Sequence, residues 1–308
     1  TGHVNAAFAM LDGLMRYFER HVTLDASGTG QEMMGRFLPL VQLPGMHQVC
    51  EMIWQVSRQD CPVLLLGETG TGKEAVAETL YRSSGRVDAP FIKMNCGSLP
   101  ESLMESELFG HEKGAFTGAV ASRKGFFERA HRGMLLLDEV DKLGSDYKGD
   151  PSSALLEVLD PEQNSEFRDH YLEVPFDLHR CMFITTANTT DTIPRALLDR
   201  MEVIELGSYT DEEKLQIAKR HLLPKQLEKH GIAKAKVRVS DDALREIIAC
   251  YTRESGVRNL ERQLAALCRK CAMRFVAEDA PKRISVTGAN LEQYLGVRRF
   301  LPDPLPAS

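Results

Sequence analysis

The sequence has 308 residues, of which 43% are hydrophobic and 27% charged; this is ordinary for a globular protein and fits one large or two modest domains. Its formal net charge of −6 argues against a broad nucleic-acid-binding surface, and no apolar run approaches the length of a membrane span. The 7 cysteines are scattered without paired metal-ligand spacing, which predicts reduced thiols and a cytoplasmic protein.

Residues 1–36 are expected to form an amphipathic helix and a linker. Apolar residues recur at helical spacing over residues 7–20, and the run Ser27-Gly28-Thr29-Gly30 ends the pattern. Docking of this helix on its own chain is the favoured alternative, and packing on a neighbouring subunit or on an upstream domain is the other. A further helix is expected over residues 46–56.

A glycine-rich stretch follows the apolar run of residues 62–66 and precedes a helical pattern. Its glycines let the backbone curl until N–H groups point inward, the next helix adds partial positive charge at its N-terminus, and Lys73 can reach outer phosphates. This predicts a phosphate-binding loop for a polyphosphate. Glu74 stands where Ser or Thr normally contacts Mg²⁺, so the metal must depend on other groups. The phosphate loop consists of Gly67, Glu68, Thr69, Gly70, Thr71, Gly72, Lys73 and Glu74.

A second apolar strand, over residues 134–137, ends in Asp138 and Glu139. Beside a phosphate loop, Asp138 can help to hold Mg²⁺ and its waters. Glu139 can polarise a water molecule for in-line attack on the γ-phosphorus. The pair therefore predicts hydrolysis of the bound nucleotide rather than binding alone.

Further strands are expected over residues 91–94 and 182–185, and all the strands alternate with helical patterns. This order predicts an α/β fold with a mostly parallel sheet and crossover helices. Asn188 follows one of these strands and can orient the attacking water against the γ-phosphate. Asn95 follows the other and can restrain Glu139 until the nucleotide state changes. Taken alone, each asparagine would more often be an ordinary turn residue.

The pattern becomes mainly helical after residue 206. Thr210-Asp211-Glu212-Glu213 has the form of a capping box, Ser240 can cap another helix, and a third helix is expected over about 259–275. Short strand signals interrupt this part at residues 237–239 and 284–286.

These patterns predict two domains joined near Gly207-Ser208, with the nucleotide between them. The expected boundaries are a large nucleotide-binding domain over 37–206, a small helical lid over 207–297 and a C-terminal tail over 298–308.

Two arginines are candidates for phosphate contacts. Arg258 begins a helix after Gly256-Val257, where a cation opposes the helix dipole unless an anion is nearby. Arg200 ends the short helical segment 194–199, where a cation is favourable in any case. The sequence leaves Arg200 between a structural ion pair and a finger that reaches the nucleotide of an adjacent subunit in a ring.

The first half of the chain carries motifs that occur together in one family. They are the phosphate loop with its Glu74, Asn95-Cys96, residues 107–119 and Gly125-Phe126-Phe127-Glu128. By these motifs, residues about 37–139 resemble the ATPase domain of bacterial enhancer-binding proteins, which activate sigma-54 RNA polymerase. In that family a Glu after the lysine is normal. The loop that engages sigma-54 corresponds to Gly114, Ala115, Phe116, Thr117, Gly118 and Ala119.

The second half carries a different set, in residues 137–143, 149–161, 185–188 and 256–262. By these motifs, residues about 134–300 resemble the ATPase module of Lon proteases. That family places an aromatic-x-Gly loop at its pore, a pattern that Phe116-Thr117-Gly118 also satisfies. An aromatic side chain flanked by glycines suits a mobile loop that presses on a polypeptide.

Both families are AAA+ ATPases, and the two resemblances meet at the acidic strand. They imply Mg²⁺ and ATP as cofactor and substrate and a homo-oligomeric ring, usually a hexamer. They also imply Asn188 as first sensor, Arg200 as the finger in trans and Arg258 as second sensor. The partner would be a protein substrate for a Lon-like module, or sigma-54 RNA polymerase for an activator.

The sequence contains neither the serine–lysine peptidase domain of Lon nor the helix-turn-helix domain of an activator. We therefore expect no peptide cleavage and no direct DNA binding by these residues. The activator-like half also lacks its family's continuation after Glu139, a pattern that a recombined or engineered hybrid would show. The favoured interpretation is a Lon-type motor that unfolds or remodels a protein. The alternatives are a sigma-54-dependent activator ATPase and a nucleotide-dependent assembly scaffold without turnover.

Overall fold

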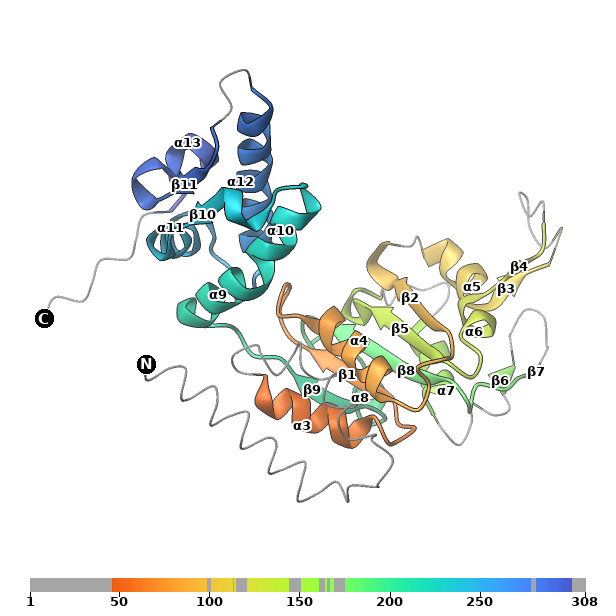
Figure 1. Cartoon of the computed structure of the whole chain (residues 1–308). Coiled ribbons are helices and arrows are strands. Elements are labelled where there is room, and N and C mark those ends of the chain that lie inside the picture. Colours follow the sequence, from red (N-terminus) through yellow and green to blue (C-terminus); the bar gives the residue numbers. More distant parts are fainter. Residues whose placement is uncertain are drawn as a thin grey trace, which may run out of the picture.

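The computed structural model shows a sheet with covering helices and, beside it, a helical lid (Figure 1). The helix expected over 7–20, the loop residues 115–119 and the tail after residue 300 lie outside the described residues. The structure describes residues 46–98, 101–112, 114, 121–143, 151–160, 164, 167–168, 175–277 and 281–300.

The central sheet has five strands, all parallel, which confirms the α/β prediction. Parallel strands end at the same edge, so the residues that follow β1, β5 and β8 meet there. Because β8 lies between β1 and β5, the segment after β8 can contact both the phosphate loop and the acidic pair. In sheet order the strands are β2 (Phe91–Asn95), β5 (Met134–Asp138), β8 (Met182–Ala187), β1 (Val63–Leu66) and β9 (Glu202–Glu205).

The edge strand β9 was not predicted. It pairs with β1, and of its four side chains only Ile204 is fully buried, while Glu202 and Glu205 are exposed. A strand with so few buried residues gives little apolar signal, in contrast to β1, β5 and β8, which are covered on both faces.

Successive residues of the central strands point to opposite faces of the sheet and enter different hydrophobic clusters. Leu65 packs with α3 and α4 on one face, whereas Leu64 packs with α5, α6, α7 and α8 on the other. Each fully buried leucine contributes about 2 kcal/mol relative to an exposed one. The covering helices are α3 (His47–Val56), α4 (Lys73–Ser83), α5 (Glu101–Phe109), α6 (Phe126–Arg129), α7 (Pro151–Val158) and α8 (Arg195–Leu198).

The lid begins as the sequence predicts. The Thr210 side chain accepts a hydrogen bond from the Glu213 backbone, and the Glu213 side chain accepts one from the Thr210 backbone, so the capping box is confirmed. α12 begins at Arg258, one residue before the predicted start. The lid contains α9 (Asp211–Ile217), a π-helical turn (Ala218–Leu222), α10 (Leu223–Lys229), β10 (Val237–Val239), α11 (Asp241–Glu246), a second π-helical turn (Ile247–Tyr251), α12 (Arg258–Val276), β11 (Ile284–Val286) and α13 (Glu292–Leu295).

The two predicted short strands of the lid, β10 and β11, form a parallel pair. Short elements complete the described chain. They are the hairpins β3 (Gly110–His111) with β4 (Arg123–Lys124) and β6 (Phe167–Arg168) with β7 (Pro175–Phe176), and the 3₁₀ turns η1 (Cys96–Ser98), η2 (Val140–Lys142), η4 (Lys234–Lys236) and η6 (Gly288–Asn290).

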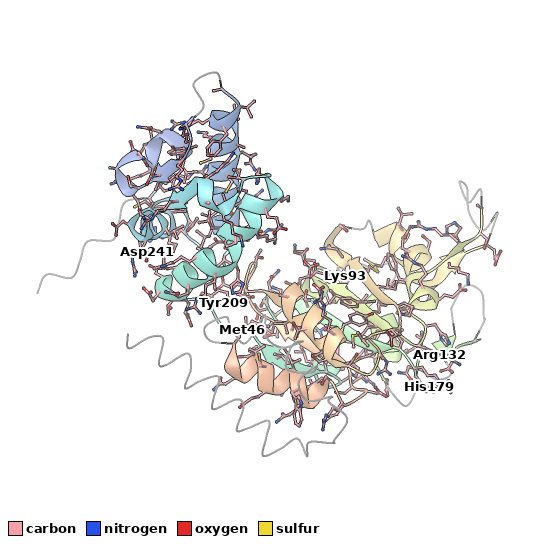
Figure 2. All side chains as sticks on the ribbon, viewed as in Figure 1. Met46, Lys93, Arg132, His179, Tyr209 and Asp241 are labelled. Carbon is pink, nitrogen blue, oxygen red and sulfur yellow. The ribbon has the colours of Figure 1, made fainter. Side chains whose placement is uncertain are left out.

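One hydrophobic cluster runs from the sheet into the lid, so the two bodies share part of their core. Met46 and Tyr209 belong to this cluster and lie where the bodies meet (Figure 2). Among the described helices, none combines the length and the apolar character that a membrane crossing needs.

Candidate functional site

The phosphate loop connects β1 to α4, as predicted. Gly70 and Gly72 have φ angles of +87° and +98°, in the left-handed region where a side chain is strained. The Lys73 ammonium donates to the carbonyl oxygens of Gly67 and Glu68, and to Asn188 Oδ1 at 2.8 Å. Burial lowers the pKa of Lys73, against the carboxylates of Asp138 and Asp141, which raise it. The structure therefore brings the predicted lysine and the predicted sensor asparagine into direct contact.

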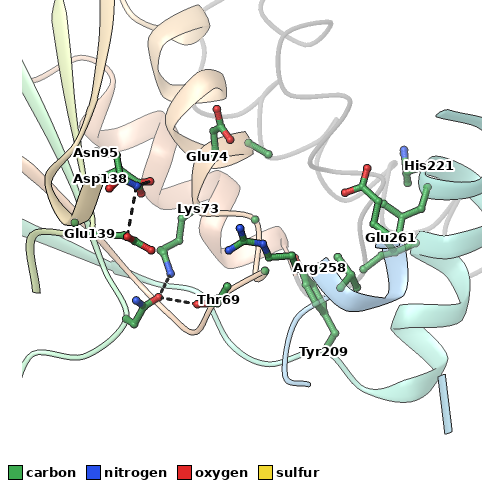
Figure 3. Close-up of a pocket in the computed structure, with 18 of the residues that line it drawn as sticks. Thr69, Lys73, Glu74, Asn95, Asp138, Glu139, Tyr209, His221, Arg258 and Glu261 are labelled. Atoms are coloured by element: carbon green, nitrogen blue, oxygen red, sulfur yellow. Dashed lines mark hydrogen bonds between the residues drawn. The ribbon is translucent and has the colours of Figure 1, made fainter. Parts of the chain in front are cut away.

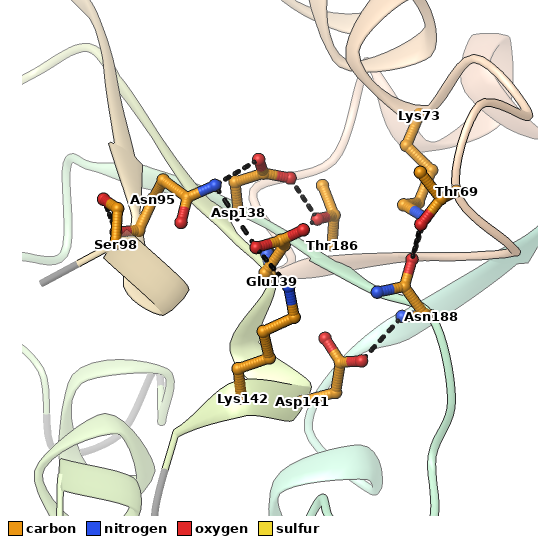
Figure 4. A network of polar contacts seen from close by, with 10 residues as sticks. All are labelled: Thr69, Lys73, Asn95, Ser98, Asp138, Glu139, Asp141, Lys142, Thr186 and Asn188. Atoms are coloured by element: carbon orange, nitrogen blue, oxygen red, sulfur yellow. Dashed lines mark hydrogen bonds and ion pairs between the residues drawn. The ribbon is translucent and has the colours of Figure 1, made fainter. Parts of the chain in front are cut away.

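The acidic pair at the end of β5 lies in a polar network (Figure 4). Asn95 Nδ2 donates to Asp138 Oδ2 at 3.0 Å and to Glu139 Oε2 at 3.5 Å. Lys142 Nζ donates to the same Glu139 oxygen at 2.7 Å. This hydrogen bond is the main cause that holds the pKa of the Glu139 carboxyl below its usual value. Glu139 is thus kept ionised, the form that can polarise a water molecule.

The backbone of Glu139 adopts the left-handed conformation, with φ 59° and ψ 47°. Its carboxylate is close to the backbone of the η1 turn, because a Cβ on Gly97 would lie 2.8 Å from Glu139 Oε2. A side chain at position 97 would therefore displace the Glu139 carboxylate or the Lys142 side chain from the positions they have here.

A cleft of about 790 Å³ lies between the sheet edge and the lid. Its volume is in the range of sites that bind molecules of nucleotide size. In Figure 3, Lys73 and Glu139 lie on the sheet side, Glu261 and His221 on the lid side, and Arg258 between them. The cleft is lined by Thr69, Gly70, Gly72, Lys73, Glu74, Ala75, Asn95, Gly97, Ser98, Asp138, Glu139, Asn188, Tyr209, Ile217, His221, Leu222, Val257, Arg258 and Glu261.

The phosphate loop also contacts the lid through its backbone. The Val257 N–H donates to the Gly70 carbonyl at 3.1 Å, and the Tyr209 hydroxyl donates to the Thr71 carbonyl at 2.7 Å. A Cβ on Gly256 would lie 2.3 Å from the Gly70 carbonyl carbon, so the approach requires glycine there. The backbone of the phosphate loop is therefore in direct contact with the residues that precede α12.

Arg258 projects into the cleft from the first residue of α12. An anion lies at this helix end within the chain, since the Glu254 carboxylate accepts hydrogen bonds from the N–H groups of Asn259 and Leu260, and the phosphate contact of Arg258 stays a prediction. Glu254 thus offsets the dipole at the end of the helix where Arg258 lies. Arg258 also lowers the pKa of Glu139 through its charge, so the two side chains are electrostatically coupled.

Arg200 does not line the cleft. Its guanidinium pairs with Asp160 Oδ2 at 2.9 Å and donates to the Ala196 carbonyl at 3.4 Å. The Arg200 side chain is 31% exposed and Asp160 13% exposed. One of the two alternatives for Arg200, the ion pair, is thus present within the chain. A role as a finger in trans stays a prediction.

The donor set of the site fits Mg²⁺. No group of three or more His, Cys, Asp or Glu side chains within the described residues is placed to hold a metal ion. Mg²⁺ does not need one, because it is usually bound by one or two carboxylates together with substrate phosphates. Asp138 can be such a carboxylate. The Glu74 side chain lines the cleft but pairs with Lys93 at 2.8 Å and is 74% exposed.

Several contacting residues were missed by the sequence reasoning. Thr186, Asp141 and Lys142 hold the predicted residues in place, and Tyr209 joins the loop to the lid. Thr186, Asp141 and Lys142 lie within the stretches 185–188 and 137–143 that resemble Lon, but nothing in those stretches signals that these side chains hold the site residues in place. Tyr209 stands in no motif. Of the expected partner loop only Gly114 is described, with a φ of +88°, and residues 115–119 lie outside the described ranges.

Comparisons with known proteins find the two families that the sequence motifs resemble. Residues 40–179 match the family model for the sigma-54 interaction domain, and residues 228–284 match that for the Lon protease AAA+ ATPase lid domain.

The curated relatives include Lon proteases. The Lon protease of Desulforamulus reducens is 50% identical over 243 residues, which cover 78% of this chain and 29% of that protein. Lon protease 1 of Bacillus subtilis is 49% identical, with 78% of this chain and 30% of that protein covered. The Lon protease of Geobacter metallireducens is 47% identical, with 78% and 29% covered. The chain thus spans less than a third of the length of these relatives.

Proposed function

This chain carries an AAA+ domain followed by a helical lid domain, and from that premise we propose that it is a Mg-ATP-hydrolysing ring motor that remodels or unfolds a protein partner. One observation carries the proposal most. A single cleft brings together the phosphate-loop lysine, the acidic pair, a strand-end asparagine and a lid arginine: Lys73, Asp138, Glu139, Asn188 and Arg258.

Each of these side chains has a distinct role in the proposed reaction. The loop backbone and Lys73 bind the polyphosphate, and Asp138 is placed to hold Mg²⁺, which when bound neutralises charge on the transferring phosphoryl group. Glu139 polarises the attacking water and accepts its proton, while Asn188, which contacts Lys73 at 2.8 Å, orients that water. Arg258, the first residue of the lid helix α12, links the presence or absence of the outer phosphate to the position of the lid.

The ring and the partner belong to the same proposal. AAA+ ATPases work as oligomers, usually hexamers, and the proposed finger Arg200 would act on the neighbouring subunit's nucleotide. The favoured partner is a polypeptide that the motor unfolds, as for a Lon-type module, because the match to the Lon relatives covers 78% of this chain. A cytoplasmic location is supported by the seven cysteines, all free thiols.

The proposal is tested by phosphate release from ATP, measured together with the mass of the assembled protein. We expect release at saturating Mg²⁺ and none when EDTA removes the metal, since phosphoryl transfer needs the charge neutralisation that Mg²⁺ supplies in addition to Lys73. Folded, assembled protein that leaves ATP intact at saturating Mg²⁺ would refute the motor. If ATP still drove the assembly, the result would favour a scaffold without turnover.

A second function is favoured by the match of residues 40–179 to the sigma-54 interaction domain. Under this alternative, the protein activates sigma-54 RNA polymerase through the loop around Phe116. The two functions differ in what the ATP-bound protein retains. We expect Glu139→Gln protein, loaded with ATP, to bind an unfolded polypeptide and to leave purified sigma-54 in solution. Retention of sigma-54 that is lost in Phe116→Ala, and absent without nucleotide, would reverse the ranking.

A further inference from the structure

The hydroxyl of Thr186 connects the two carboxylates at the end of β5. Thr186 is fully buried, and its Oγ1 donates to Asp138 Oδ1 at 2.5 Å and accepts from the Glu139 N–H at 3.0 Å. A hydroxyl has one proton to donate and two lone pairs that accept, so it can make both bonds at once. Figure 4 shows Thr186 beside Asp138 and Glu139.

Both bonds act on groups that the proposed reaction uses, and one of them holds a strained backbone. Among the described residues, the non-glycine positions with positive φ are Arg132 and Glu139. Such a conformation is unfavourable for a residue with a Cβ and persists only when its surroundings hold it. The bond to the Glu139 N–H is one of these restraints. The other bond fixes the rotation of the Asp138 carboxylate, whose second oxygen accepts from Asn95.

The position of Thr186 follows from the sheet. Strand β8 is paired in parallel with β5 on one side and with β1 on the other, and Thr185 is in register with Leu137. The residue after Thr185 therefore lies level with the end of β5, where the acidic pair begins. Successive side chains alternate between the faces of a sheet, so Thr185 and Thr186 point in opposite directions.

From this geometry we infer that Thr186 is a positioning residue for ATP hydrolysis, whose hydroxyl sets the orientation of the Asp138 carboxylate and the backbone of Glu139. The inference rests on the proposed ATPase function. Thr186 acts through the two acidic residues and does not itself touch substrate.

The chain provides a matched control in Thr185. It is fully buried like Thr186, and its hydroxyl donates to the Val63 carbonyl at 3.2 Å and lies 3.2 Å from Met201 Sδ. Replacing either threonine by valine keeps the shape and removes one buried hydroxyl. Only at position 186 does that hydroxyl bind the acidic pair.

The test is the Mg²⁺ and ATP dependence of phosphate release by Thr186→Val, Thr185→Val and Thr186→Ser. We expect Thr186→Val to lower kcat about 30-fold, with KM for ATP changed less than about threefold, because two hydrogen bonds to the hydrolytic groups are lost. The Mg²⁺ concentration for half-maximal rate should rise, since Asp138 then keeps only its hydrogen bond from Asn95. Thr185→Val should keep the wild-type Mg²⁺ dependence, and Thr186→Ser should restore most of kcat.

Equal kcat in Thr186→Val and wild type would overturn the inference, as would an equal loss in the two valine variants. A Thr186→Ser protein as slow as Thr186→Val would assign the effect to the methyl group and also overturn it. If Thr186→Val does not fold, Thr186→Cys replaces it, and wild-type kcat in that variant would count against the hydroxyl. Failure of the proposed function is distinct, because then the wild-type protein itself would not hydrolyse ATP.

Discussion

Glu139→Gln protein is expected to bind ATP with nearly wild-type affinity and to release phosphate about 1,000-fold more slowly, because a positioned general base contributes on the order of 10²–10⁴-fold to a rate. Glutamine matches the size of glutamate but cannot accept the proton of the attacking water. It also loses the charge that pairs with Lys142 at 2.7 Å. Phosphate release and equilibrium ATP binding, measured on the same preparation, check both parts of this expectation.

Two comparisons make the result specific to the site. Glu128 pairs with Lys124 and does not line the cleft, so Glu128→Gln should leave phosphate release unchanged. Lys73→Ala removes the cation of the phosphate loop and should lose ATP binding as well as hydrolysis. A loss of less than about tenfold in Glu139→Gln would be smaller than the effect of a general base. In that case another group would have to polarise the water.

Arg200→Ala is expected to lower phosphate release at least about 100-fold if its guanidinium completes the neighbouring subunit's site, since arginine fingers contribute about 10³–10⁵-fold in other phosphoryl-transfer enzymes. Mixing this variant with Lys73→Ala provides the decisive measurement. In a mixed ring, the Lys73→Ala subunit has an intact Arg200, and the Arg200→Ala subunit has an intact phosphate loop. Activity of the mixture should therefore exceed that of either variant alone. Absence of any recovery would count against a role in trans.

The ion pair with Asp160 supplies the control for a structural role. If Arg200 only stabilises its own subunit, Asp160→Asn and Arg200→Ala should have similar small effects, because partly exposed pairs contribute about 0.2–1 kcal/mol. If Arg200 acts on the neighbouring nucleotide, Asp160→Asn should retain hydrolysis while Arg200→Ala loses it. Thermal denaturation of both variants separates the two explanations.

The sheet could be predicted where its strands are buried on both faces. Strands β1, β5 and β8 each contain an apolar run, and the covering helices repeat apolar residues at helical spacing. The edge strand β9 was not predicted, because it pairs only with β1 and both of its glutamates are exposed. Local pattern predicts an element when burial is complete, and edge strands depend on pairing that the pattern does not contain.

The same distinction holds within the site. Lys73, Asp138 and Glu139 were recognised because each occurs in a short motif whose spacing reflects its chemistry. Thr186 was not, since its role depends on β8 lying beside β5, and the two bonded residues are far apart in sequence. The contact between Gly70 and Gly256 likewise exists only once the lid folds against the sheet domain. Residues that position others are determined by topology, which a motif does not record.

The close approach of Gly70 and Gly256 limits how such chains can be spliced. Gly70 lies in the phosphate loop of the sheet domain, and Gly256 lies in the lid just before α12. A Cβ at Gly70 would lie 2.9 Å from the Arg258 nitrogen, and one at Gly256 would lie 2.3 Å from the Gly70 carbonyl carbon. Exchange of the lid or the sheet domain for that of another protein therefore requires glycine at both positions. Residues 70 and 256 therefore constrain each other, although they belong to different domains.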